Sequence, residues 1–240
     1  MFERNEMMVP RMTRALVLSI LLLVIGMQAQ QPTVVAAQPK SVARFATGFN
    51  DQFSAFNTNW VATRGSWNIS TGFLRAVATA NKSFSQAYFA QAQYENQDFQ
   101  VRMRRTGCGT CANGIFVRST KDGTVRFKYT NSGEYAIEKC GASSCTFIEP
   151  FTPHFAVLKG GYNTLRVVAV DNRYDFLINN KFVASHVITG RSYGYAGVSF
   201  HNNMITGNTF DVDWAVLSNR SRMCGMARVC LLQNGNHELP

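Results

Sequence analysis

Carboxylate pairs are the first feature of this sequence that could do chemistry, because hydrolysis of a glycosidic bond uses two of them. A compact acidic pattern on one strand, such as E-x-D-x-x-E, is absent from the chain. The nearest acidic strand is FDVDWAVL, in which Asp211 and Asp213 share a face but no glutamate follows. A catalytic pair would therefore have to come from separate strands, and Glu138 is the further candidate for it.

Nucleophilic catalysis by a serine triad is not indicated either. The chain has four histidines, and no serine is expected in a G-x-S-x-G nucleophile elbow, the strand-to-helix turn that exposes a catalytic hydroxyl. His186 lies on an alternating strand and is expected to be structural. His201, in SFHNN, follows a strand end, where binding loops usually lie, so it is a candidate ligand contact.

The N-terminal segment indicates export. Arg11 and Arg14 precede the apolar run ALVLSILLLVIGM, and VVAAQ offers small residues for cleavage after Ala37. The rival interpretation is a membrane anchor, but the run is shorter than the ~20 residues that a spanning helix needs. We therefore expect a signal peptide over residues 1–37, a linker over 38–47, and a secreted or cell-envelope protein without a stable membrane span after cleavage.

The cysteines are expected to form short-range disulfides, because an even number in an exported chain favours them. They fall into near neighbours: Cys108 with Cys111, Cys140 with Cys145, and Cys224 with Cys230. The run CGASSC suits the tip of a hairpin. Two alternatives remain open, a zinc site from CGTC and CGASSC together, and a redox dithiol in CGTC alone. The connectivity does not follow from the sequence.

The chain is basic, with Lys+Arg 24 against Asp+Glu 14 and a formal net charge of +10. The basic residues are spread along the chain, and VRMRR at 101–105 is the compact cluster. Alternation along a strand would place Arg102 and Arg104 on one face and Arg105 on the other. This pattern is typical of a solvated strand face, and an anionic glycan or cell-wall polymer is the alternative. Nucleic acid is not expected, because no recognition motif is present.

From residue 48 to 217 the sequence predicts β-structure throughout, without a convincing helical period. The expected strands are FLRAVAT, DFQVRMRR, GIFVRST, VRFKYT, EYAIEK, FAVLK (155–159), TLRVVAV, YDFLIN, KFVASHV, AGVSF and TFDVDWAVL. In the stretch 163–190, VDNR and the pair Asn179-Asn180 favour tight turns between strands. The prediction is an all-β fold with two antiparallel sheets in a jelly-roll sandwich, with a closed barrel as the alternative. Residues 218–240 leave this pattern and are expected to form a cysteine-closed loop and a loose end.

The order of short motifs resembles a known group of domains. FNDQFS, GSWNISTGFLRA, DFQVRMR, FKYTNSGEYAIEK, LKGGYNTLRVVAVDNRYDFLINNKFVAS, GYAGVSF and FDVDWAVL follow one another over about residues 48–217. In this order they resemble the concanavalin A-like, laminin G-like jelly rolls of exported bacterial proteins, in particular those of the 3-keto-disaccharide hydrolase-like type. The resemblance implies a jelly-roll sandwich that binds or processes carbohydrate. Two departures are the cysteine pairs and Asn179-Asn180, where such hairpins usually carry Asn-Gly.

The resemblance also implies one structural calcium ion, which such modules often hold between their first and last strands. Asp51 near the start, with Asp211 or Asp213 near the end, would supply its carboxylates. The alternative is that these aspartates cap strands or pair with arginine.

A sugar-binding surface needs aromatic rings beside polar donors. Tyr129 and Tyr135 flank the turn in FKYTNSGEYAIEK, and Arg118 ends the neighbouring strand. With His201, they are the expected ligand contacts, although alternating aromatics in a sandwich also suit its core.

The favoured function is a secreted, non-catalytic module that binds carbohydrate or another envelope ligand. The alternatives are a glycan hydrolase and a structural or adhesive envelope protein.

Overall fold

The computed structural model describes residues 43–44, 47–55, 57–70, 72–79, 83–202 and 206–219. The expected signal peptide, most of the expected linker, and Cys224 and Cys230 lie outside these residues. Within them, no helix is long and apolar enough to cross a membrane. Every named element of this part of the chain is a β-strand, which confirms the all-β prediction.

Two antiparallel sheets form the domain, as predicted for a jelly-roll sandwich. The seven-stranded sheet contains, in spatial order, β12 (Cys145–Pro153), β11 (Glu134–Cys140), β10 (Gly123–Tyr129), β9 (Asn113–Thr120), β16 (Tyr195–Asn202), β6 (Ser83–Phe89) and β3 (Trp60–Arg64). The eight-stranded sheet contains β15 (Lys181–Val187), β14 (Arg173–Ile178), β13 (Asn163–Val170), β8 (Gln97–Thr106), β17 (Thr209–Asn219), β5 (Phe73–Val77) and β4 (Trp67–Ser70), and β2 (Gly48–Asp51) also pairs with β17. A short parallel ladder joins β1 (Ala43–Arg44) to β7 (Ala92–Gln93).

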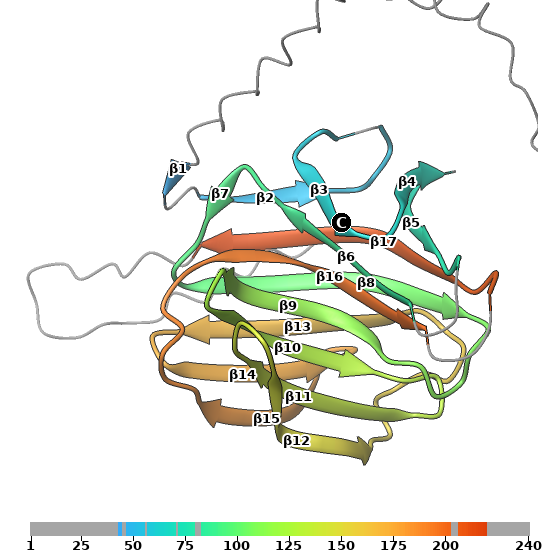
Figure 1. Cartoon of the computed structure of the whole chain (residues 1–240). Helices are drawn as coiled ribbons and strands as arrows, with labels where there is room; N and C mark the ends of the chain where they lie inside the picture. The colour runs from blue at the N-terminus through green and yellow to red at the C-terminus, as the bar shows by residue number, and fades with distance from the viewer. Residues whose placement is uncertain are drawn as a thin grey trace, which may run out of the picture. The chain divides into compact units, whose positions relative to one another are not determined.

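Alternation of apolar and polar residues turns one face of each sheet into a shared core. In β8, Met103 is fully buried while Arg102 and Arg104 on the other face are partly exposed, as the sequence predicts. Phe127 of β10 meets Phe176 of β14 with ring centroids 5.2 Å apart, so the two sheets touch directly. Figure 1 shows this layering, with β9 to β12 drawn across β13 to β15.

Tight turns set the register of β13, β14 and β15. Asn179 and Asn180 have φ values of 49° and 60°, in the left-handed region that a two-residue hairpin turn requires. Asp171, in the predicted turn VDNR, has a φ of 51°. The predicted hairpin ladder is therefore confirmed.

Part of the predicted strand pattern is wrong. Residues 155–159 form turns, in which the amide of Val157 donates to the carbonyl of His154 at 3.1 Å. The run does not alternate into the core, because Phe155 is 82% exposed. The sequence prediction also omitted β1, β2, β3, β4, β6, β7 and β12. Pro150 and Pro153 argue against a strand in the sequence of β12. Proline is tolerated there because β12 lies at the edge of its sheet.

Two of the expected disulfides lie in the described part of the chain, and both are confirmed. Cys108 is bonded to Cys111, and Cys140 to Cys145. Cys140 and Cys145 are direct partners in the ladder of β11 and β12, so this disulfide closes the tip of a hairpin. Because all four sulfur atoms are in disulfides, they do not form the alternative zinc cage of thiolates.

Candidate ligand-binding face

The outer face, defined as the surface of the seven-stranded sheet that points away from the core, carries unusually buried polar side chains. Lys128 of β10 and Glu138 of β11 are 5% and 6% exposed, and Ser199 of β16 has no exposed surface. Strand pairing aligns Gln86, Ser199, Gly114 and Lys128 in one row across the sheet. Charged side chains are almost never this buried unless they are paired, so this face is the candidate site.

An ion pair on the outer face joins β10 and β11, next to the edge strand β12. The Lys128 ammonium donates to Oε1 of Glu138 in a short contact. Lys128 Nζ also lies 5.6 Å and 5.4 Å from the ring centroids of Phe147 and Phe151 on β12. Burial lowers the pKa of the Lys128 amine, and the hydrogen bond to Glu138 opposes that shift. The pair therefore neutralises itself, and the partly exposed phenylalanines form a wall beside it.

Arg126, next to this pair, is a cation without a carboxylate of its own. Its Cζ lies 5.2 Å from the ring centroid of Phe84 on β6, and Nη1 lies 3.6 Å from Sγ of Cys145. Its Nε is buried and has no hydrogen-bond partner among the described residues. Burial lowers the pKa of Arg126, and the charge of Glu138 opposes the shift. The guanidinium is thus only partly satisfied.

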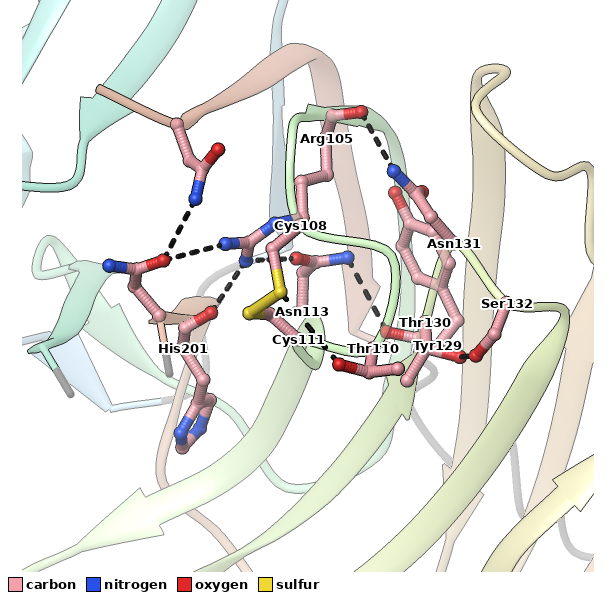
Figure 2. Close-up of a disulfide and its surroundings, with 12 residues drawn as sticks. Arg105, Cys108, Thr110, Cys111, Asn113, Tyr129, Thr130, Asn131, Ser132 and His201 are labelled. Atoms are coloured by element: carbon pink, nitrogen blue, oxygen red, sulfur yellow. Dashed lines mark hydrogen bonds between the residues drawn. A yellow bond between two sulfur atoms is a disulfide. The ribbon is translucent and has the colours of Figure 1, made fainter. Parts of the chain in front are cut away.

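A buried arginine on the core side holds the end of β16 in place (Figure 2). Arg105 donates to the carbonyl of His201 at 2.5 Å and to Oδ1 of Asn113 at 2.9 Å. Asn131 Nδ2 in turn donates to the carbonyl of Arg105 at 3.2 Å. Burial lowers the pKa of Arg105 to about 10, so it remains charged at neutral pH. This network fixes the backbone that presents His201, close to the disulfide of Cys108.

The His201 imidazole lies on the outer face with its ring centroid 4.4 Å from that of Phe84. Its Nε2 is buried and has no partner in the described part of the chain. Burial lowers the pKa of His201 to about 3, and the positive charges of Lys128, Arg126 and Arg105 add to the shift. At neutral pH the ring is therefore uncharged and surrounded by cations.

A cleft of about 410 Å³ opens at one end of the outer face. Its lining consists of Thr63, Gln86, Tyr88, Gln93, Ser119, Thr120, Lys121, Asp122, Tyr193 and Tyr195. The rings of Tyr88 and Tyr195 lie 4.7 Å apart between centroids, tilted by 54°. Aromatic faces beside amides and hydroxyls are typical of small-molecule pockets of this size.

Gly194 positions two of the cleft tyrosines. It pairs with Tyr94 through hydrogen bonds in both directions, of 2.9 Å and 3.1 Å. Its φ is +149°, and a Cβ there would lie 2.5 Å from the carbonyl carbon of Arg118. Only glycine allows this close approach. Tyr193 and Tyr195 flank it and line the cleft.

The tyrosine cleft and the charged residues of β10 and β11 belong to one continuous surface. The next row of the sheet aligns Tyr88, Gly197, Phe116 and Arg126. A Cβ on Gly197 would lie 2.4 Å from Cζ of Phe116, so the missing side chain leaves room for that ring. Tyr88 therefore lies in the same row as Arg126.

Three of the four predicted ligand contacts lie in the interior. Arg118 and Tyr129 have no exposed surface, and Tyr135 is 6% exposed. The Arg118 guanidinium donates to the hydroxyl of Tyr174 at 2.9 Å and to several carbonyls, so it links the ends of strands. Tyr135 packs edge-on against Phe127 in the core. Of the four, His201 lies on the outer face, and its contact with a ligand stays a prediction.

The predicted calcium ligands are engaged elsewhere. β2 does pair with β17, but Oδ2 of Asp51 accepts hydrogen bonds from Asn57 at 2.8 Å and from Trp60 Nε1 at 2.9 Å. Asp211 is paired with Arg75, and Asp213 with Arg102, on the eight-stranded sheet. Among the described residues, one group of possible metal ligands lies close enough together to hold an ion, namely Glu138, Cys140 and Cys145. It contains none of these aspartates. The residues therefore fit a calcium ion poorly, and the site stays an untested prediction.

The tyrosine cleft was missed by sequence reasoning. Its clearest signal is SYGYAG, which places Tyr193 and Tyr195 on either side of a glycine. The same segment contains GRSYG, which matches the G-x-S-x-G pattern, so the expectation that no serine lies in this pattern was wrong. Ser192 is exposed in the loop before β16, and no helix follows it, so the setting of a nucleophile elbow is absent from this described segment.

The fold is shared with several solved structures. The carbohydrate-binding module CBM66 from Bacillus subtilis aligns with a TM-score of 0.53 and 16% identity, over 65% of this chain and 92% of that one. A Bacillus licheniformis β-glucanase aligns with a TM-score of 0.58 and 10% identity, over 73% and 99%. A laminarinase from Flavobacterium sp. UMI-01 gives 0.54 and 12%, over 71% and 98%.

No protein-family model matches this sequence, and no curated protein matches it either. At these low identities the structural likeness concerns the fold alone. The chain thus has the jelly-roll β-sandwich fold that these structures share.

Proposed function

We propose that this protein binds carbohydrate on its outer face, with the tyrosine cleft as the main subsite. The observation that carries the proposal is the cleft itself, in which Tyr88, Tyr193 and Tyr195 surround a pocket with two glutamines and three hydroxyl side chains. Sugar rings offer apolar faces to aromatic rings and hydroxyl groups to amides. The lining matches both requirements.

The tyrosine hydroxyls supply hydrogen-bond donors at neutral pH. Burial raises the pKa of Tyr88, and the neighbouring Tyr195 raises it further. The phenol therefore remains protonated and able to donate to a sugar oxygen. Gln86 and Gln93 each add one acceptor and two donors.

Structural neighbours support the proposal by analogy. One is a carbohydrate-binding module and others are glucanases. An extracellular or envelope location would suit such a function. The two disulfides and the N-terminal apolar segment support that location, because disulfides persist in oxidising compartments.

The test is a glycan array followed by titration calorimetry with the best ligand. Tyr195→Ala should weaken binding by about 2 kcal/mol, on the order of 30-fold in Kd, as expected for a central aromatic contact. The matched control is Phe182→Ala, which removes a 59% exposed ring from β15 on the other sheet. It should bind as the wild type does. Equal weakening by both changes, or no glycan bound by the folded protein, would refute the proposal and favour a structural role.

A second candidate is glycan hydrolysis, because Glu134 and Glu138 lie on the same face of β11. Both are engaged: Glu138 pairs with Lys128, and Oε2 of Glu134 accepts a hydrogen bond from Ser132 at 2.8 Å. This weakens the candidate relative to binding alone. Incubation of the bound glycan with wild type and with Glu138→Gln, followed by reducing-end assay, separates the two. Release by the wild type and none by the variant would establish hydrolysis.

A further inference from the structure

Two guanidinium groups of the outer face approach one aromatic ring. The Cζ atoms of Arg64 on β3 and Arg126 on β10 lie 5.7 Å and 5.2 Å from the ring centroid of Phe84. Their separation is therefore no greater than the sum of these distances. The two like charges interact, because Arg64 contributes to the lowering of the pKa of Arg126.

Neither guanidinium is neutralised by a carboxylate. Among the described residues no ion pair includes Arg64 or Arg126, and Glu138, whose charge raises the pKa of Arg126, is paired with Lys128. By contrast, the half-buried Arg166 is paired with Asp98 at 2.7 Å. Two adjacent cations without an acid form a site for an anion.

Further polar atoms around Phe84 lack partners. Ser199 Oγ and His201 Nε2 are buried and, within the described residues, make no hydrogen bond. Ser199 has no exposed surface and lies opposite Gln86, which lines the tyrosine cleft. His201 is opposite Phe84 in the same ladder. A hydroxyl donor and an uncharged imidazole thus lie on the same face as the two cations.

The anion site and the cleft lie on one strand. Phe84, Gln86 and Tyr88 point to the same side of β6, so Phe84 lies about 7 Å from Gln86 and about 13 Å from Tyr88 along the strand. Arg64 pairs with Gln86 in the ladder of β3 and β6. One oligosaccharide could therefore reach both places at once.

We infer that the ligand is an acidic glycan, whose carboxylate or sulfate group binds beside Phe84 between Arg64 and Arg126, while another ring of the same chain lies in the tyrosine cleft. This inference rests on the proposed carbohydrate function and narrows its ligand class.

The experiment compares matched charged and neutral polymers by affinity electrophoresis in 150 mM salt. The carboxylate pair is polygalacturonate and its methyl ester, and the sulfate pair is dextran sulfate and dextran. The wild type should bind the charged member of at least one pair about tenfold more tightly or better, as expected for a charge-assisted hydrogen bond. The pair that shows the preference identifies the anion.

Two variants and a control locate the effect. Arg64→Gln and Arg126→Gln should each remove most of the preference for the charged polymer. Arg64 is exposed, so its replacement leaves the core untouched even where Arg126→Gln perturbs folding. Arg173→Gln removes the same charge from an exposed residue of β14 and should leave the preference unchanged.

The outcomes distinguish this inference from the broader proposal. Equal retention of charged and neutral polymers overturns the acidic-glycan inference but leaves the carbohydrate-binding proposal intact. Retention of none of the four polymers overturns the acidic-glycan inference and also counts against carbohydrate binding. An equal loss in Arg173→Gln and Arg64→Gln also overturns it, because the preference would then reflect net charge.

Discussion

The ion pair between Lys128 and Glu138 allows a quantitative test of how the outer face is built. The two side chains are 5% and 6% exposed and lie on the neighbouring strands β10 and β11. Glu138→Gln keeps the shape of the side chain but removes its charge. It leaves the Lys128 ammonium buried between the Phe147 and Phe151 rings without a counterion.

Loss of one partner of a buried pair costs about 3–5 kcal/mol, because the remaining charge is desolvated without compensation. For a domain of this size each kcal/mol shifts Tm by roughly 2–4 °C, so Glu138→Gln should melt about 6–20 °C below the wild type. The double variant Lys128→Met/Glu138→Leu removes both charges and should return to within about 1 kcal/mol of the wild type. The coupling between the two positions should therefore be large.

The pH dependence has a defined sign. Burial lowers the pKa of Lys128 in the folded protein, so the unfolded chain binds its proton more tightly. Glu138→Gln removes the hydrogen bond that opposes this shift, so the stability deficit of the variant should shrink as the pH rises towards the unfolded pKa of about 10.4.

Urea denaturation of the oxidised protein measures these differences. The control is Arg173→Gln, which breaks the exposed pair with Asp175 and should cost only about 0.2–1 kcal/mol. A loss of stability below about 1 kcal/mol in Glu138→Gln would show that the pair is not effectively buried and would refute the reasoning. A double variant as unstable as Glu138→Gln would refute it as well.

Two further predictions concern other groups of the same region. Because the pKa of folded His201 is about 3 and that of an unfolded histidine about 6.5, stability should fall by at most about 1.4 kcal/mol per pH unit as the pH drops from 6.5 to 3. His201→Gln should flatten this part of the pH profile in urea denaturation, and an unchanged slope would contradict the assignment. Replacing both Cys140 and Cys145 by serine should cost about 2 kcal/mol through the entropy of the opened loop, and an unaltered denaturation midpoint would count against that disulfide.

Local features of the fold could be predicted from the sequence. The turn at Asn179 and Asn180 depends on two adjacent residues that tolerate left-handed backbone, and Cys140 and Cys145 are close enough in the chain to bond across one hairpin. The inward direction of Arg105 follows from alternation along one strand. In each case the determining residues are neighbours in the chain.

The site could not be predicted, because it depends on strands that are distant in the chain. Tyr88 and Tyr195 meet because β6 pairs with β16, a crossover that no local pattern specifies. Arg118 was expected on a ligand surface, since it ends a strand of alternating residues. Its φ of 50° breaks the alternation, and its guanidinium is used by carbonyl groups inside the protein.

The distribution of charge between the two sheets links the net charge of +10 to the proposed ligand. On the eight-stranded sheet, Arg75, Arg102 and Arg166 are matched by Asp211, Asp213 and Asp98. The buried Arg105 of the same sheet is held instead by carbonyl and amide oxygens.

On the outer face of the seven-stranded sheet, Glu138 neutralises Lys128, and Arg64 and Arg126 remain without a described acidic partner. A merely soluble surface would intersperse both signs, whereas an excess of one sign on a partly buried face raises the local concentration of oppositely charged ligands. The charges of Arg64 and Arg126 lie on the same face as the tyrosine cleft. An acidic sugar would use both the cations and the tyrosine rings.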